Sequence, residues 1–231
     1  MSEVTLLRAG TDGTFVEQAS AYLIAGMNQA IADRGVCIMG LSGGSTPGPV
    51  YHALGSDRSV DWSKVWLFLT DDRFVPPDDP NSNQFLLQST LLRHAPVPEA
   101  RRIFPDTKLP LAECVDSYEQ RLKDLFGKGS PDIIILGMGE DGHIASLFPP
   151  LGNEAFGSRL VIHTVTEEFS VRDRISVTMP VLTRSRKSFL LLKGEGKRRT
   201  WEEMEKSTEG GKRWPAKEIA AKTPMTVAVQ W

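Results

Sequence analysis

The segment Asp132–Leu136 (DIIIL) is the part of the sequence that most constrains the fold. Its last four residues form a continuous apolar run that is rich in β-branched side chains, and Gly137 ends it at once. Such a run is typical of a strand whose two faces are both covered by other elements. It therefore predicts a parallel sheet buried between layers of helices.

The rest of the chain alternates between short apolar runs and stretches with helical spacing. The apolar runs predict strands at Val4–Leu7, Val36–Leu41, Val65–Leu69, Leu160–Val165, Ile175–Met179, Ser188–Leu192 and Met225–Val229. Helical spacing predicts helices at Phe15–Arg34, from Pro47 onward, at Asn83–Arg93, at Leu111–Phe126 and in the first half of Lys197–Trp214. This alternation predicts an α/β fold: a single domain over residues 1–231 with a mostly parallel, Rossmann-like sheet and helices on both faces.

Length and charge narrow the classes of function. A chain of 231 residues suits one α/β domain, and a net charge of -2 gives no general electrostatic reason to bind nucleic acid or an acidic membrane. No apolar run reaches the roughly 20 residues that cross a bilayer. We expect a cytoplasmic protein without nucleic-acid or membrane partners, and the sequence leaves open whether it is a monomer or a small homo-oligomer.

Three segments leave apolar strands and become rich in Gly, Asp, Ser or His. They are Ser42–Pro47, Thr70–Arg73 and Gly137–Ser146. In open α/β sheets, ligands bind beyond the carboxyl ends of the strands, where the following helices begin. The three segments are therefore expected to meet in one cleft.

The first segment combines Gly43 and Gly44 with the hydroxyls of Ser45 and Thr46 and a proline suited to the first helical position. Backbone N–H groups at a helix start favour a phosphate group. An ordinary turn with a Ser or Thr helix cap is an equally good interpretation of these residues alone. No Lys-Ser or Lys-Thr follows the glycines, which argues against a nucleoside triphosphate site.

The segment Gly137–Gly142 matches the spacing of a dinucleotide-binding loop. Pro149 and Pro150, however, would end a following helix within two turns, whereas a dinucleotide site needs a full helix. The alternative is a tight glycine turn that presents His143 to the cleft, and histidine titrates near neutral pH. We favour His143 as a catalytic residue.

Charged residues complete the candidate site. Asp71-Asp72-Arg73 follows a buried strand, so at least one carboxylate should face the cleft, although a solvated turn is the alternative. Arg174 and Lys197 flank later strands and could bind a phosphate. Each of these two is, on its own, more often a surface charge.

Taken together, these motifs resemble those of the 6-phosphogluconolactonase family. The similar stretches are LSGGSTP (Leu41–Pro47), TDDRFVPPDDPNSN (Thr70–Asn83), LGMGEDGHIASLFP (Leu136–Pro149), RISVT (Arg174–Thr178) and GEGKR (Gly194–Arg198). They follow the family's order over nearly the whole chain. One departure is Asp72, which stands where the family usually has glutamate, and this leaves the role of Asp72 open.

The resemblance implies hydrolysis of 6-phospho-D-glucono-1,5-lactone, a small sugar phosphate, to 6-phosphogluconate in the pentose phosphate pathway, without a metal or an organic cofactor. His143 would be the general base, and Asp71, or else Asp141, would hold its imidazole or bind sugar hydroxyls. The residues that the resemblance assigns to substrate and phosphate binding are Gly43, Gly44, Ser45, Thr46, Arg73, Asn83, Asp141, Gly142, Arg174 and Lys197.

Three other interpretations remain. Glucosamine-6-phosphate deaminases look similar in these loops, but they carry a glutamate where Phe148 stands here and a tyrosine where Arg73 stands. A non-catalytic sugar-phosphate sensor would keep the phosphate loop and have no need for His143. An NAD-dependent oxidoreductase rests only on the glycine spacing.

Overall fold

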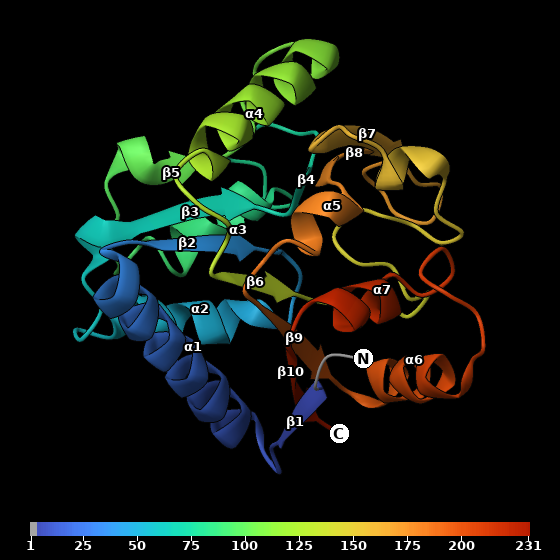
Figure 1. Ribbon diagram of the computed structural model, residues 1–231, viewed down its shortest axis with the longest axis horizontal. Coiled ribbons are helices and arrows are strands. Elements are labelled where there is room, and N and C mark those ends of the chain that lie inside the picture. Colours follow the sequence, from blue (N-terminus) through green and yellow to red (C-terminus); the bar gives the residue numbers. More distant parts are fainter. Residues whose placement is uncertain (1–3) are drawn as a thin grey trace.

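Seven parallel strands form the central sheet of the computed structural model, which describes residues 4–231 (Figure 1). The first three residues of the expected domain lie outside the described residues. The strand order across the sheet is β1-β10-β9-β6-β2-β3-β5. The bounds are β1 Val4–Arg8, β2 Cys37–Leu41, β3 Val65–Leu69, β5 Arg102–Ile103, β6 Ile133–Leu136, β9 Lys187–Lys193 and β10 Met225–Gln230.

Helices cover both faces of this sheet (Figure 1), as its apolar strands predict. Successive side chains of a strand point to opposite faces, so Met39 of β2 belongs to the core layer on the side of α1, α2 and α3, whereas Ile38 belongs to the core layer on the side of α4 to α7. The bounds are α1 Asp12–Arg34, α2 Pro47–Ser56, α3 Asn83–Ser89, α4 Leu111–Phe126, α5 Met179–Leu182, α6 Glu195–Lys206 and α7 Pro215–Lys222. The predicted α/β fold with a mostly parallel sheet is confirmed.

A second, antiparallel sheet is the main feature that the sequence pattern did not predict. It has the order β4-β8-β7, with β4 at Asp71–Arg73, β8 at Asp173–Val177 and β7 at Val161–Val165. The solvated turn that was the alternative for Asp71–Arg73 does not form, because these residues pair with Arg174 to Ser176 of β8. Three charged residues lack the apolar pattern of a strand, and they adopt a strand conformation because they pair with β8.

Thr70 joins the two sheets, because β3 ends at Leu69 and β4 begins at Asp71. Its N–H donates to the carbonyl of Leu41 in the large sheet at 2.9 Å, and its own carbonyl accepts from Val177 of the small sheet at 2.8 Å. Thr70 is fully buried. The two sheets are thus fixed to each other at this residue, and the carboxyl ends of β2 and β3 face the small sheet.

Several predicted boundaries change. The third helix ends at Ser89 instead of Arg93, and the strand predicted at Ile175–Met179 is β8, which begins at Asp173 and ends at Val177. Met179 instead begins the short helix α5, and α7 was not predicted. Three short 3₁₀ helices complete the described elements, at Trp62–Lys64, Glu99–Arg101 and Asn153–Phe156.

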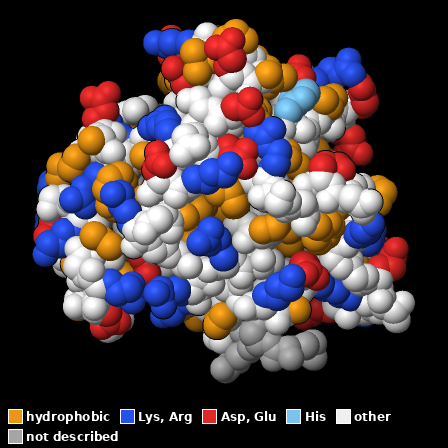
Figure 2. All heavy atoms as spheres, turned by 45° about the horizontal axis from the view of Figure 1, so that its top comes forward, with side chains coloured by type: hydrophobic (Ala, Val, Ile, Leu, Met, Phe, Trp, Pro, Cys, Tyr) orange, Lys and Arg blue, Asp and Glu red, His pale blue; other side chains and the backbone are white. Residues whose placement is uncertain are grey.

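The described part of the chain contains no helix long and apolar enough to cross a membrane. On the face drawn in Figure 2, acidic and basic side chains are interspersed, as the small net charge leads one to expect.

Candidate active site

A cavity of about 460 Å³ lies where the carboxyl ends of β2, β3 and β6 meet the small sheet. The three segments singled out from the sequence all reach it. Its lining residues are Ser42, Gly43, Gly44, Ser45, Thr46, Pro47, Asp71, Arg73, Asn83, Gly137, Met138, Gly139, Glu140, Asp141, His143, Ala145, Phe148, Glu168, Phe169, Arg174, Leu191 and Lys197.

The ends of three strands are tied together beneath this cavity. The hydroxyl of Ser42, which follows β2, lies 2.8 Å from the hydroxyl of Thr70, which follows β3. The same Ser42 hydroxyl donates to the carbonyl of Ile135 in β6 at 2.9 Å, and Tyr51 of α2 donates to the Ser42 carbonyl at 2.7 Å. Because these groups are buried and paired, they fix the loops that leave the strands.

The loop between β2 and α2 presents backbone donors to the cavity. Pro47 and Pro49 have no N–H, so the amides available at this helix start are those of Ser45, Thr46 and Gly48. Thr46 occupies the helix-cap position, but its side chain makes no capping hydrogen bond. This loop therefore does not form an ordinary capped turn, and the N–H groups at the helix start are available to bind an anion.

Gly43 allows this loop to lie directly against Asn83. A Cβ atom built on Gly43 would lie 1.7 Å from Oδ1 of Asn83, so any larger residue would displace the Asn83 side chain. Asn83 is buried, and its Nδ2 donates to the carbonyl of Asp71 at 2.8 Å. Within residues 4–231, its Oδ1 has no hydrogen-bond partner, which leaves a buried acceptor beside the cavity.

His143 lies in a tight turn after β6, with Nδ1 at 2.6 Å from Oδ1 of Asp141. The same Asp141 oxygen accepts from the backbone N–H of His143 at 3.2 Å. Burial acts to raise the pKa of Asp141, but the hydrogen bond and charge of His143 outweigh it and hold this pKa below its usual value. An ionised Asp141 selects the tautomer with the proton on Nδ1, so that Nε2 of His143 can accept a proton.

Two aromatic rings pack against this imidazole. The Phe148 ring centroid lies 5.0 Å from that of His143, and the Phe169 centroid lies 5.7 Å from it with an edge-on geometry. Phe148 follows the histidine turn, whereas Phe169 comes from the loop between β7 and β8. The rings restrict the imidazole and exclude water from part of its surface.

Asp71 points into the same cavity but does not hold the imidazole. Its Oδ2 accepts from the Ser146 hydroxyl at 2.7 Å. The orienting partner of His143 is Asp141, the alternative that sequence reasoning ranked lower. Asp71 stands instead as a carboxylate on the cavity wall, where it can accept hydrogen bonds from ligand hydroxyls.

Three basic residues from different elements converge on the cavity: Arg73 of β4, Arg174 of β8 and Lys197 of α6. Burial, followed by the nearby charge of Arg73, lowers the pKa of Arg174, although a guanidinium stays charged at neutral pH. Burial also lowers the pKa of Lys197, against the opposing effects of Glu140 and Asp141. These desolvated cations, two of which repel each other, favour a bound anion.

The two arginines are held differently. Nη1 of Arg73 donates to the carbonyl of Asn81 at 2.5 Å, while its buried Nε has no partner among the described residues. Nε of Arg174 donates to the carbonyl of Val171 at 2.9 Å, and its guanidinium lies over the Phe169 ring at 5.4 Å. Both side chains are therefore anchored at one point and retain further donors for a ligand.

Of the twelve candidate residues, Gly142 alone does not line the cavity. It has a φ of 91° and packs on the Trp214 ring, so it shapes the histidine turn from behind. Sequence reasoning missed Glu168 and Phe169 because the antiparallel sheet that brings their loop to the cavity was not predicted. No group of three or more His, Cys, Asp or Glu side chains in residues 4–231 could hold a metal ion.

The sequence profile of one family, described as glucosamine-6-phosphate isomerases/6-phosphogluconolactonase, matches residues 10–229. The chain belongs to this family. Among individual members, it is 38% identical over 209 residues to a protein named probable 6-phosphogluconolactonase from Dictyostelium discoideum, a match that covers 89% of each chain. It is 32% identical over 210 residues to the 6-phosphogluconolactonase of Synechocystis, covering 88% of this chain and 86% of the relative.

Solved structures of family members share the fold. The crystal structure of 6-phosphogluconolactonase from Thermotoga maritima superposes with a TM-score of 0.86 at 26% identity and covers 99% of both chains. The structure of 6-phosphogluconolactonase from Plasmodium vivax gives a TM-score of 0.89 at 26% identity, covering 97% of this chain and 90% of that one. The family resemblance predicted from the sequence motifs is thus confirmed.

Proposed function

We propose that this chain hydrolyses 6-phospho-D-glucono-1,5-lactone to 6-phospho-D-gluconate, a reaction of the oxidative branch of the pentose phosphate pathway in the cytoplasm, and that residues 1–231 act as one hydrolase domain. The observation that carries the proposal is the His143–Asp141 pair at 2.6 Å, which opens into a cavity where Arg73, Arg174 and Lys197 converge. A base next to a cluster of cations suits an ester that carries a phosphate.

In the proposed mechanism, Nε2 of His143 takes a proton from water while the water oxygen attacks the lactone carbonyl carbon. The bond between that carbon and the ring oxygen then breaks, and the imidazolium returns its proton to the departing ring oxygen. The Asp141 carboxylate stabilises the imidazolium that exists between the two steps. Water is the only co-reactant, so the step is balanced without a cofactor.

The phosphate group would bind at the start of α2, with the amides and hydroxyls of Ser45 and Thr46, and would be neutralised by the three cations. A dianion between Arg73 and Arg174 would offset the burial and the repulsion from Arg73 that lower the pKa of Arg174. The Asp71 carboxylate on the cavity wall is suited to accept hydrogen bonds from sugar hydroxyls.

Phe148 favours a lactonase over a deaminase. Its ring lies 5.0 Å from the imidazole and has no group that can transfer a proton, whereas the resemblance to deaminases would require a carboxylate there for ring opening. We therefore expect no ammonia release from glucosamine 6-phosphate at an enzyme concentration that hydrolyses the lactone completely. Ammonia release that disappears in H143A would reverse this ranking.

The direct test follows lactone hydrolysis with the spontaneous rate subtracted, since δ-lactones also open unaided in water. The lactone is generated in place by oxidation of glucose 6-phosphate and consumed within the same assay. A rate that is proportional to the concentration of this chain and at least about 100-fold lower in H143A supports the proposal. A rate equal to the spontaneous one at micromolar protein would refute it.

A further inference from the structure

The position of the imidazole depends on the backbone of one short turn. The N–H of Gly139 donates to the carbonyl of His143 at 2.9 Å, and the N–H of Gly142 donates to the carbonyl of Gly139 at 3.0 Å. Asp141, which holds both the ring and the N–H of His143, lies in the middle of this turn. A shift of the Asp141 backbone would therefore move the carboxylate and the imidazole together.

Two side chains from a distant part of the sequence hold this backbone from outside. The hydroxyl of Thr200 in α6 donates to the carbonyl of Glu140 at 2.9 Å. Nη1 of Arg213, in the connection between α6 and α7, donates to the carbonyl of Asp141 at 2.9 Å. Arg213 does not line the cavity, so its guanidinium contacts the turn and not the ligand.

Arg213 is itself fixed by its neighbour. Its guanidinium carbon lies 3.7 Å from the centroid of the Trp214 ring, a close cation–π stack. Trp214 is 1% exposed and packs against Gly142, where an added Cβ would lie 2.8 Å from the ring. Within residues 4–231, the carboxylate that pairs with Arg213 is that of Glu203, which is 3.9 Å away and largely exposed, so the stack and the hydrogen bond define the position of Arg213.

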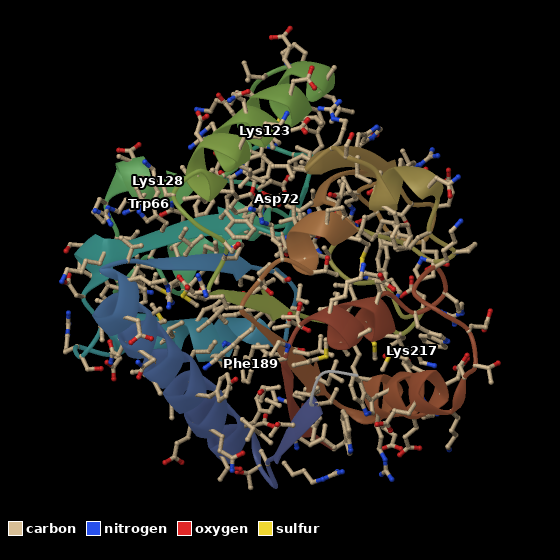
Figure 3. The ribbon with its side chains drawn as sticks, viewed as in Figure 1. Trp66, Asp72, Lys123, Lys128, Phe189 and Lys217 are labelled. Carbon is tan, nitrogen blue, oxygen red and sulfur yellow. The ribbon has the colours of Figure 1, made fainter. Side chains whose placement is uncertain are left out.

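The connection that carries Arg213 is anchored at both ends. The N–H groups of Arg213 and Trp214 both donate to the carbonyl of Gly210, at 3.0 and 2.9 Å. Nζ of Lys217 in α7 donates to the carbonyl of Ser207 at the start of the connection (Figure 3). A side chain held on a rigid support can fix the group to which it donates.

We propose that Arg213 is a positioning residue for the catalytic pair: through the Asp141 carbonyl and the Trp214 stack, it holds the turn in which Asp141 orients His143. This proposal rests on the proposed function for its kinetic consequences alone. Its structural consequence, a short hydrogen bond between Asp141 and His143 Nδ1, can be measured without substrate.

The test compares R213M, which keeps an apolar side chain over Trp214 but loses the donor and the charge, with R213K, which keeps a charged donor. R198M is the matched control, because Arg198 is an exposed arginine of α6 that pairs with Glu202. A misplaced base reduces the rate of the chemical step, so R213M should lower kcat by about 10- to 100-fold with KM within about twofold, and R213K should recover most of the loss. R198M should match the wild type.

The readout without substrate is the low-field proton NMR signal of the hydrogen bond between Asp141 and His143 Nδ1. This signal should weaken or move upfield in R213M and persist in R213K and R198M, with all variants showing a native thermal transition. An unchanged signal and unchanged kcat in folded R213M, or a raised KM with unchanged kcat, would overturn the positioning role. If R213M does not fold, R213Q takes its place in the same comparison and has the same expected and contrary outcomes, since a neutral amide loses the charge and the guanidinium stack. A wild type without lactonase activity would refute the proposed function and leave the NMR result valid.

Discussion

Asp71 and Asp72 are adjacent in β4, yet their carboxylates lie on opposite sides of the strand. Asp71 accepts from Ser146 at the cavity wall. Asp72 lies in the interior (Figure 3), where Oδ1 accepts from the N–H of Arg73 at 2.8 Å and from the N–H of Asn83 at 2.6 Å. The sequence leaves the role of Asp72 open. In the structure, Asp72 joins β4 to the start of α3 and does not reach the cavity.

This position of Asp72 predicts a pH-dependent stability. Burial raises the pKa of Asp72 from 3.8 to about 6, despite the hydrogen bonds that act to lower it. Between these values the folded protein keeps a proton that the unfolded chain has released, so the free energy of unfolding falls as the pH rises through this window. At about 1.4 kcal/mol for each unit of difference between the two pKa values, the free energy of unfolding should fall by roughly 3 kcal/mol across this window.

Chemical denaturation of the wild type and D72N at pH values from 4 to 7 measures this effect. The difference in unfolding free energy, wild type minus D72N, should decrease up to about pH 6 and then level off. D78N, which alters an exposed carboxylate of the following loop, serves as the control and should run parallel to the wild type. A difference that grows with pH would show that Asp72 is stabilised in its charged form.

The second prediction concerns the catalytic pair. H143A should lower kcat by about 10²- to 10⁴-fold, because it removes the proposed general base. H163A is a close control, since Nε2 of His163 also pairs with a carboxylate, that of Asp173 at 2.8 Å, but outside the cavity. Steady-state kinetics with the spontaneous rate subtracted should show near-wild-type turnover for H163A. Comparable losses in both variants would remove His143 from its catalytic role.

A third prediction separates a sugar-phosphate site from a generic esterase. Charge-assisted hydrogen bonds to the phosphate contribute roughly 1.5 to 3 kcal/mol each, so the loss of several should weaken binding more than the loss of any single sugar hydroxyl contact. Unphosphorylated gluconolactone should react with kcat/KM lower by at least about 10³-fold, because phosphate binding also positions the carbonyl. The ratio of the two kcat/KM values is the measurement.

Arg174 should account for part of that preference. R174A should reduce the ratio, whereas R172A, two residues earlier and solvent-exposed beside Glu167, should leave it unchanged. Equal efficiency of the wild type on both lactones would mean that the loop before α2 does not recognise phosphate.

The fourth prediction concerns Lys197. Burial lowers its pKa below the ordinary 10.5, and only the protonated amine attracts the phosphate. The affinity for 6-phosphogluconate should therefore fall as the pH rises through this lowered pKa, before an exposed lysine would lose its proton. Isothermal titration calorimetry from pH 7 to 10 gives the curve. K197M should bind weakly with little dependence on pH in this range, and K206M, at the exposed end of the same helix, should follow the wild type.

The sequence predicted the large sheet well because its strands are apolar on both faces, and this pattern is local. It also predicted the three loops at the cavity, since each directly follows such a strand. The antiparallel sheet was missed because β4 consists of three charged residues whose strand conformation depends on pairing with β8. Phe169 and Arg213 were missed for a related reason: each acts on His143 or its turn from a segment at least 26 residues further along the chain, and no local pattern signals such a contact.

Thr70 has a consequence for how the cavity is formed. One continuous segment runs from the large sheet through this buried residue into the small one, with a backbone hydrogen bond to each. His143 stands on the large-sheet side and Arg174 on the small-sheet side, so this junction sets the distance between the proposed base and the proposed phosphate-binding arginine. We therefore expect the two walls of the cavity to keep their spacing when a ligand binds, so that the cavity selects sugar phosphates by their length.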